Sequence, residues 1–85
     1  MATQAPHVMA ARVLRQARLA RGESLETVAG RTRIHVQYLE ALENDSPPRA
    51  FPSPIYARLF LRTYARYLGL EEEPLVEAFG LRHGA

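Results

Sequence analysis

The fold is decided by the stretch GESLETVAGRTRIHVQYLEAL, residues 22–42, which predicts two short helices joined by a tight turn. The first is expected at 24–31, with Ser24 as the residue whose hydroxyl accepts from an unpaired N–H of the first turn. The second is expected at 35–43, after a turn at 32–34. Apolar residues recur where two steeply crossing helices need contacts, namely at Val28, Ala29, Ile34, Leu39 and Leu42. This pattern is typical of a helix-turn-helix unit, which commonly places its second helix in a groove of DNA.

Three further helices are expected around this unit. One runs from Val8 to Ala20, with Val13, Leu14 and Ala17 on its inner face. Another runs over 54–68 and ends at Gly69, and the last covers 72–79. Its three glutamates at 71–73 lie where a helix dipole favours negative charge.

Residues 44–54 are expected to form a loop, because they contain four prolines and a helix does not continue through such a run. Phe51 in its middle is expected to hold the loop to the core. The predicted fold class is therefore all-α, a compact five-helix bundle of the repressor-like helix-turn-helix type. We expect one domain over 8–80, with a flexible lead-in at 1–7 and a tail at 81–85.

Composition limits the classes of function. The chain has 85 residues, enough for one modest core, and no cysteine, which excludes disulfides and cysteine-based metal sites or nucleophiles. Its three histidines are scattered, and no glycine-rich phosphate loop is present, so we expect neither an enzyme nor a cofactor. The net charge of +2 is low for a protein that binds nucleic acid. No run approaches the roughly 20 apolar residues of a membrane span.

The helix at 54–68 is apolar over more of its circumference than one buried face requires. On a helical wheel its core stripe is formed by Ala57, Leu61, Tyr64 and Leu68, and a basic stripe by Arg58, Arg62 and Arg66. A further line holds Tyr56, Phe60, Thr63 and Tyr67. Two explanations remain open at this point: either the helix is central and these aromatic residues belong to the core, or Tyr56 and Phe60 are partly exposed anchors for a protein partner.

Two runs of residues resemble known families. The run from Leu14 through Ala29 resembles the Cro/repressor-type helix-turn-helix fold. The run Tyr-Ala-Arg-Leu-Phe-Leu-Arg-Thr-Tyr-Ala-Arg-Tyr-Leu-Gly-Leu, residues 56–70, is more specific and is similar to the cytoplasmic domain of the RodZ family of bacterial cell-shape proteins. The resemblance covers residues 11–79.

The resemblance implies a binding function. In that family the domain binds the bacterial actin MreB, and a transmembrane segment further along the protein links the filament to wall synthesis. The family's contact is centred on the fourth helix, where two aromatic positions one turn apart match Tyr56 and Phe60. The implied partner is thus an MreB-type actin filament, and the implied location is the cytoplasm, or the cytoplasmic face of the inner membrane if the chain is a fragment. The expected contact residues are Tyr56 and Phe60 as anchors, with Arg58, Arg62, Thr63 and Arg66 as polar neighbours.

A sequence-specific DNA-binding regulator is the alternative, with the helix at 35–43 in the major groove. Its expected contacts are Arg31, Arg33, His35 and Gln37, since arginine can pair with guanine and glutamine with adenine. Three observations weaken it. Leu25 stands where such repressors often carry a phosphate-anchoring glutamine, and no dimerisation element is evident. Glu40, Glu43 and Asp45 are also expected to place negative charge near the phosphates, so any nucleic-acid binding should be weak.

Overall fold

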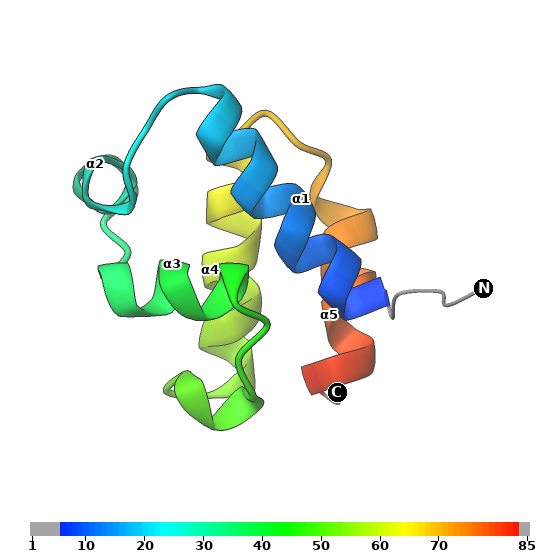
Figure 1. Cartoon of the computed structure of the whole chain (residues 1–85). Coiled ribbons are helices and arrows are strands. Elements are labelled where there is room, and N and C mark those ends of the chain that lie inside the picture. The colour runs from blue at the N-terminus through cyan, green and yellow to red at the C-terminus, as the bar shows by residue number, and fades with distance from the viewer. Residues whose placement is uncertain (1–5, 84–85) are drawn as a thin grey trace.

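The computed structural model describes residues 6–83, with side chains through residue 80, and its regular secondary structure over that range consists of helices joined by loops (Figure 1). Its elements are α1 (Pro6–Ala20), α2 (Leu25–Thr32), α3 (Val36–Glu43), the short 3₁₀ turn η1 (Pro48–Ala50), α4 (Pro54–Tyr67) and α5 (Glu72–His83). The predicted all-α class with five α-helices is confirmed for the described residues. α1 begins before the expected Val8, and α5 continues beyond the expected Phe79.

The turn between α2 and α3 is built from local hydrogen bonds. Ser24 caps α2 as predicted, because its Oγ accepts from the Thr27 N–H at 3.1 Å. At the other end of α2, Arg33 adopts a left-handed conformation (φ 64°), and its N–H donates to the Ala29 carbonyl at 2.9 Å. The Thr32 hydroxyl donates to the Val28 carbonyl at 2.8 Å. Ile34 is buried at the end of this turn, as expected for one of the apolar contacts between the two helices.

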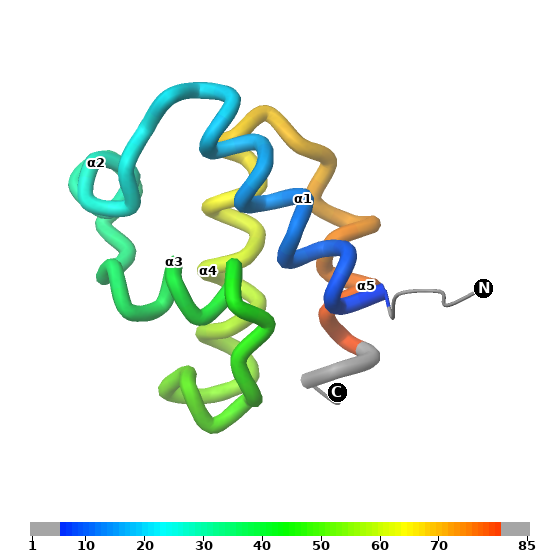
Figure 2. The backbone as a smooth tube through the Cα atoms, viewed as in Figure 1, coloured from blue at the N-terminus to red at the C-terminus, as the bar shows by residue number. Residues whose placement is uncertain are grey.

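α4 is the central helix of the bundle. It contacts α2, α3 and α5, and Figure 2 shows it running between α3 and α5. The predicted core stripe is confirmed, since Ala57, Leu61, Tyr64 and Leu68 are all buried. Phe51 is also buried and holds the proline-rich loop to the core, as expected.

The expected inner face of α1 is partly wrong. Ala10, Ala11 and Leu14 are buried and Ala17 packs against the core, but Val13 is exposed. Successive residues of an α-helix are about 100° apart, so Val13 lies well to one side when Leu14 faces the core. The small side chains of Ala10 and Ala11 fill the inner face instead.

A buried carboxylate, Glu43, joins three helices. The Arg18 guanidinium of α1 donates to both oxygens of Glu43 at the end of α3, from Nε at 2.7 Å and from Nη2 at 2.9 Å. The Tyr64 hydroxyl of α4 donates to the same carboxylate. The side chains of Arg18 and Glu43 are 11% and 4% exposed. Burial, together with the nearby Glu43 carboxylate, raises the pKa of Tyr64 far above its ordinary value.

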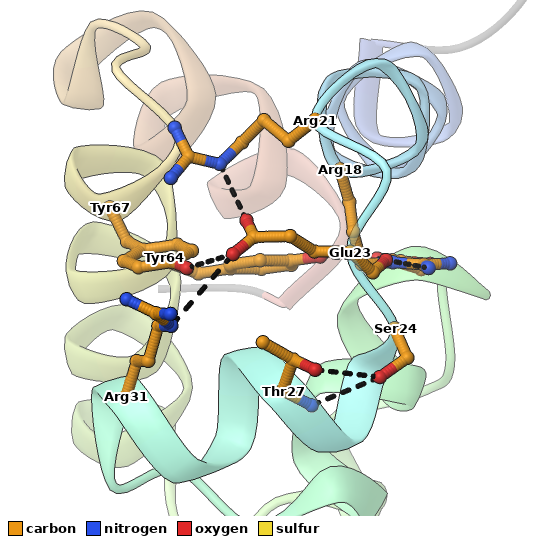
Figure 3. A network of polar contacts seen from close by, with 9 residues as sticks. Arg18, Arg21, Glu23, Ser24, Thr27, Arg31, Tyr64 and Tyr67 are labelled. Carbon is orange, nitrogen blue, oxygen red and sulfur yellow. Dashed lines mark hydrogen bonds and ion pairs between the residues drawn. The ribbon is translucent and has the colours of Figure 1, made fainter.

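A second carboxylate, Glu23, links the α1–α2 loop to the end of α4. Arg21 donates to one oxygen of Glu23 at 2.6 Å, and the Tyr67 hydroxyl donates to the other at 2.6 Å. The Arg21 guanidinium also lies 4.7 Å from the centre of the Tyr67 ring. In Figure 3 these side chains converge from the two segments, with Arg31 approaching from α2. The hydrogen bonds from Arg21 and then Tyr67 lower the pKa of Glu23.

Replacing Glu43 should be costly. In Glu43→Ala the Arg18 guanidinium and the Tyr64 hydroxyl lose their acceptor inside the bundle, so the free energy of unfolding should fall by about 3–5 kcal/mol. Urea unfolding followed by circular dichroism measures this loss. Glu40→Ala, an exposed site on the same helix, is the control and should change stability by no more than about 0.5 kcal/mol. Equal losses in the two variants would contradict this role of Glu43.

Tyr64 should also make stability depend on alkaline pH. Its pKa is raised in the folded state, so the unfolded chain releases this proton first. The contribution of Tyr64 is therefore complete below the ordinary tyrosine pKa and is lost as the pH rises above it. Tyr64→Phe removes one hydrogen bond, at a cost of about 1 kcal/mol at pH 7. The unfolding free energy of this variant should fall less steeply than that of the wild type above pH ~10, and parallel slopes would argue against the assignment.

Candidate protein-binding surface on α4

The first two turns of α4 carry a concentration of exposed apolar side chains. Ile55, Tyr56 and Leu59 are 73%, 49% and 51% exposed. In the described part of the chain the other large apolar side chains with such exposure are spread along α1, at Met9, Val13 and Leu19. An exposed apolar surface concentrated in this way is characteristic of an interaction site.

Local sequence explains why this end of α4 is ordered. Ser53 caps the helix by accepting from the Tyr56 N–H at 3.4 Å, and Pro54 occupies the first helical position, where its missing N–H costs nothing. The preceding residues are held by the buried Phe51. The start of α4 is therefore fixed on the loop side, while its outer face remains in solvent.

A stack of aromatic rings runs from the core to this surface. The Tyr38 ring of α3 lies between Phe51 and Phe60, with ring centroids 6.2 Å and 5.0 Å apart and both pairs stacked. Phe60 in turn contacts Tyr56 at 5.8 Å. Phe51 is buried, Phe60 is half-buried against the core, and Tyr56 is exposed. Each such pair contributes roughly 0.5–1.5 kcal/mol to stability beyond its buried area. The Tyr56 ring is therefore held in place by its contact with Phe60.

Each of the two explanations that the helical wheel of α4 left open therefore holds in part. α4 is central, and Phe60 packs against the core cluster, yet Tyr56 remains half-exposed at the edge of the same stack. Both expected anchor positions lie on one continuous surface. Thr63, one turn further on, is half-buried.

The arginine stripe divides into two parts. Arg62 is ion-paired with Glu73 at 2.8 Å and Glu72 at 3.6 Å, and Arg66 with Glu72 at 2.9 Å. These pairs join α4 to the start of α5, and the hydrogen bond from Arg66 lowers the pKa of Glu72. Arg58 is exposed and makes no such ion pair within the described residues. Of the three arginines, Arg58 has the guanidinium that is not already engaged by α5.

Ile55, Leu59 and Tyr38 also belong to this surface, although the sequence pattern did not single them out. Ile55 and Leu59 lie on the side of the wheel opposite the core stripe, and that position alone predicts their exposure. Tyr38 could not be found in this way, because its contact with Phe60 joins α3 to α4 across the proline-rich loop.

The residues expected to contact DNA are all exposed, at the end of α2, in the turn and at the start of α3: Arg31, Arg33, His35 and Gln37. His35 caps α3 without a side-chain hydrogen bond, and its ring meets Tyr38 edge-on at 6.2 Å. Leu25, at the first position of α2, packs against the core and is not available to phosphate.

The expected charge repulsion near DNA requires correction. Glu43 is buried beneath Arg18 and Tyr64 and does not face the α2–α3 surface. Asp45 accepts from His7 of α1 at 2.8 Å and is also largely covered. Glu40 is the exposed member of the three carboxylates. The case against DNA binding is therefore weaker than the sequence indicates, because two of the three carboxylates serve the fold.

Within the described residues, no histidine, aspartate and glutamate side chains form a group of three or more that could hold a metal ion. No helix within residues 6–83 combines the length and the apolar character needed to cross a bilayer.

Comparison with known proteins agrees with this architecture. Residues 13–75 match the model of a family described as a helix-turn-helix domain. Over 67 residues the chain is 39% identical to the cytoskeleton protein RodZ of Streptococcus pneumoniae strain R6, an alignment that covers 79% of this chain and 24% of that protein. The chain thus spans about a quarter of the length of this relative. No solved structure gives a significant match.

The aromatic stack predicts different stability costs for its outer two members. Tyr56→Ala removes a half-exposed ring and should lower the free energy of unfolding by less than about 1 kcal/mol. Phe60→Ala opens a gap beside Tyr38 and should cost about 2–3 kcal/mol, below the ~3–5 kcal/mol of a fully buried phenylalanine. Chemical denaturation of both variants measures the difference. If Tyr56→Ala proved as costly as Phe60→Ala, Tyr56 would be a core residue.

Proposed function

The chain belongs to this family of helix-turn-helix domains, and from that membership we propose that it is a cytoskeletal adaptor that binds the bacterial actin MreB through α4 in the maintenance of cell shape. The likeness to RodZ, whose name describes a cytoskeleton protein, supports the class of partner. The match of the helix-turn-helix model supports a binding domain rather than an enzyme.

One observation carries the proposal, namely the exposed apolar surface at the start of α4. Tyr56 offers an aromatic ring with a polar tip, and its neighbour Phe60 is held by Tyr38. Aromatic and arginine side chains dominate binding energy at protein interfaces. Because the rings are already ordered before binding, little side-chain entropy is lost when a partner covers them.

The expected polar neighbours differ in what they can contribute. Arg58 is exposed and available to a partner, and Thr63 lies at the edge of the aromatic row. Arg62 and Arg66 would have to exchange their ion pairs with α5 for new ones, so they should add little affinity. In this proposal the domain acts in the cytoplasm, at the inner membrane if the chain is part of a longer protein with a membrane anchor.

DNA binding through α3 remains the second candidate, because the structure leaves Arg31, Arg33, His35 and Gln37 exposed together. The withdrawal of Glu43 and Asp45 into the fold also removes part of the repulsion expected there. Against it, Arg31 lies 3.9 Å from Glu23, which offsets part of its charge. The protein-binding surface is the better supported of the two.

Co-sedimentation with polymerised MreB from the same organism tests the proposal. The wild-type domain should pellet with filaments, and Tyr56→Ala should lose at least tenfold in affinity while remaining folded by circular dichroism. Gln37→Ala, on the candidate DNA surface, is the matched control and should pellet like the wild type.

The same three proteins should be titrated with duplex DNA over a range of salt concentrations. Absence of pelleting by the wild type, together with salt-dependent duplex binding that Gln37→Ala weakens, would overturn the adaptor proposal in favour of DNA recognition. Loss of pelleting by Gln37→Ala but not Tyr56→Ala would place the filament contact on α3 and reject α4 as the site.

A further inference from the structure

The exposed apolar surface of α4 is wider than the aromatic row alone. At about 100° per residue, Phe60, Tyr56, Leu59 and Ile55 follow one another around the helix axis and span about 140° of its circumference. Arg58 borders this arc on the far side from Phe60. Ile55 and Leu59 are the middle of the outward face, since they lie opposite the buried stripe that contains Leu61 and Tyr64.

We propose that the protein partner of α4 presents a concave, apolar groove with an acidic rim, and that Ile55 and Leu59 enter it together with Tyr56 and Phe60. This inference rests on the proposed function, because it describes the surface that such a partner must offer. A flat partner surface covers less of this arc of about 140° than a groove does. A groove that receives a helix contacts residues on several adjacent rows at once.

The charges around α4 determine the character of the rim. No aspartate or glutamate occurs between residues 46 and 70, whereas four arginines do, at 49, 58, 62 and 66. Glu72 and Glu73 of α5 neutralise Arg62 and Arg66. Arg49 of η1 and Arg58 of α4 keep their positive charge, and Arg58 lies next to Ile55 on the wheel. Carboxylates on the partner at that edge complement it.

The ion pairs with α5 also set where the contact ends. Arg62 and Arg66 occupy the outward face on the third and fourth turns of α4, on the C-terminal side of Ile55 and Leu59. The groove therefore accommodates the first two turns of the helix, and the partner need not displace the α4–α5 ion pairs in order to bind.

Two leucines make a matched test. Leu59 and Leu19 are 51% and 54% exposed, both on helices, so Leu59→Ala and Leu19→Ala remove the same atoms at the same cost in folding. In filament co-sedimentation, Leu59→Ala should raise the apparent Kd at least tenfold and Leu19→Ala less than twofold. Ile55→Ala should behave like Leu59→Ala.

Two arginines test the rim in the same way. Arg58→Glu and Arg15→Glu each reverse one exposed charge on a helix. Arg58→Glu should raise the Kd at least tenfold at low salt and by a smaller factor at high salt, because added salt screens the repulsion. Arg15→Glu should have little effect at either salt concentration.

The possible outcomes separate this inference from the proposed function. If Tyr56→Ala abolishes pelleting but Leu59→Ala and Arg58→Glu do not, the contact is confined to the aromatic row; the groove is then rejected while filament binding stands. Wild-type protein that does not pellet overturns both.

Flotation with phosphatidylglycerol vesicles and sedimentation equilibrium of the domain alone complete the test. The inference would be overturned if Leu59→Ala abolished vesicle binding or self-association and left filament binding unchanged. The exposed face of α4 would then bind a lipid surface or a second copy of the domain.

Discussion

The structure depends on a single buried carboxylate and the donors that surround it. A carboxylate removed from water is strongly destabilising unless its oxygens accept hydrogen bonds. The donors must therefore lie where the carboxylate is. Glu43 accepts hydrogen bonds from Arg18 of α1 and from Tyr64 of α4. Three helices are thereby held in one relative position at the centre of a small bundle. Apolar packing alone would tolerate small rotations of these helices, whereas a two-pronged guanidinium contact does not.

This constraint fixes the rotation of α4 and, with it, the face that reaches solvent. Tyr64 must point toward Glu43. Phe60 lies one turn earlier and about 40° away around the axis, and Tyr56 two turns earlier and about 80° away, so both are placed at the edge of the core. There Phe60 meets Tyr38 and Phe51, and Tyr56 projects beyond them. At the other end of α4, Tyr67 donates a hydrogen bond to Glu23, which also accepts one from Arg21. The exposed apolar surface is therefore presented by a helix fixed at both ends.

The parts of this arrangement that are periodic in sequence could be predicted, and those that depend on long-range pairing could not. The core stripe of α4, the Ser24 and Ser53 caps and the burial of Phe51 all follow from local pattern and capping chemistry. The role of Glu43 does not, because a glutamate at a helix end is ordinarily solvated, and its partners lie 25 and 21 residues away. The predicted burial of Val13 is wrong for a related reason. When two adjacent residues are both apolar, the sequence does not show which of them faces the core until the neighbouring helices are known.

The two candidate surfaces share a boundary, and this limits how the domain can be used. His35, at the start of α3, touches Tyr38, which stacks on Phe60 of α4. A standard protein interface covers about 800 Å² per partner, which is about 15% of the 5332 Å² that the chain exposes. An interface of that size centred on Tyr56 would extend from α4 toward Tyr38 and His35. A partner of protein size seated on α4 and a duplex seated on α3 would therefore compete for the same edge, so any DNA binding would be confined to domains not engaged by a partner on α4.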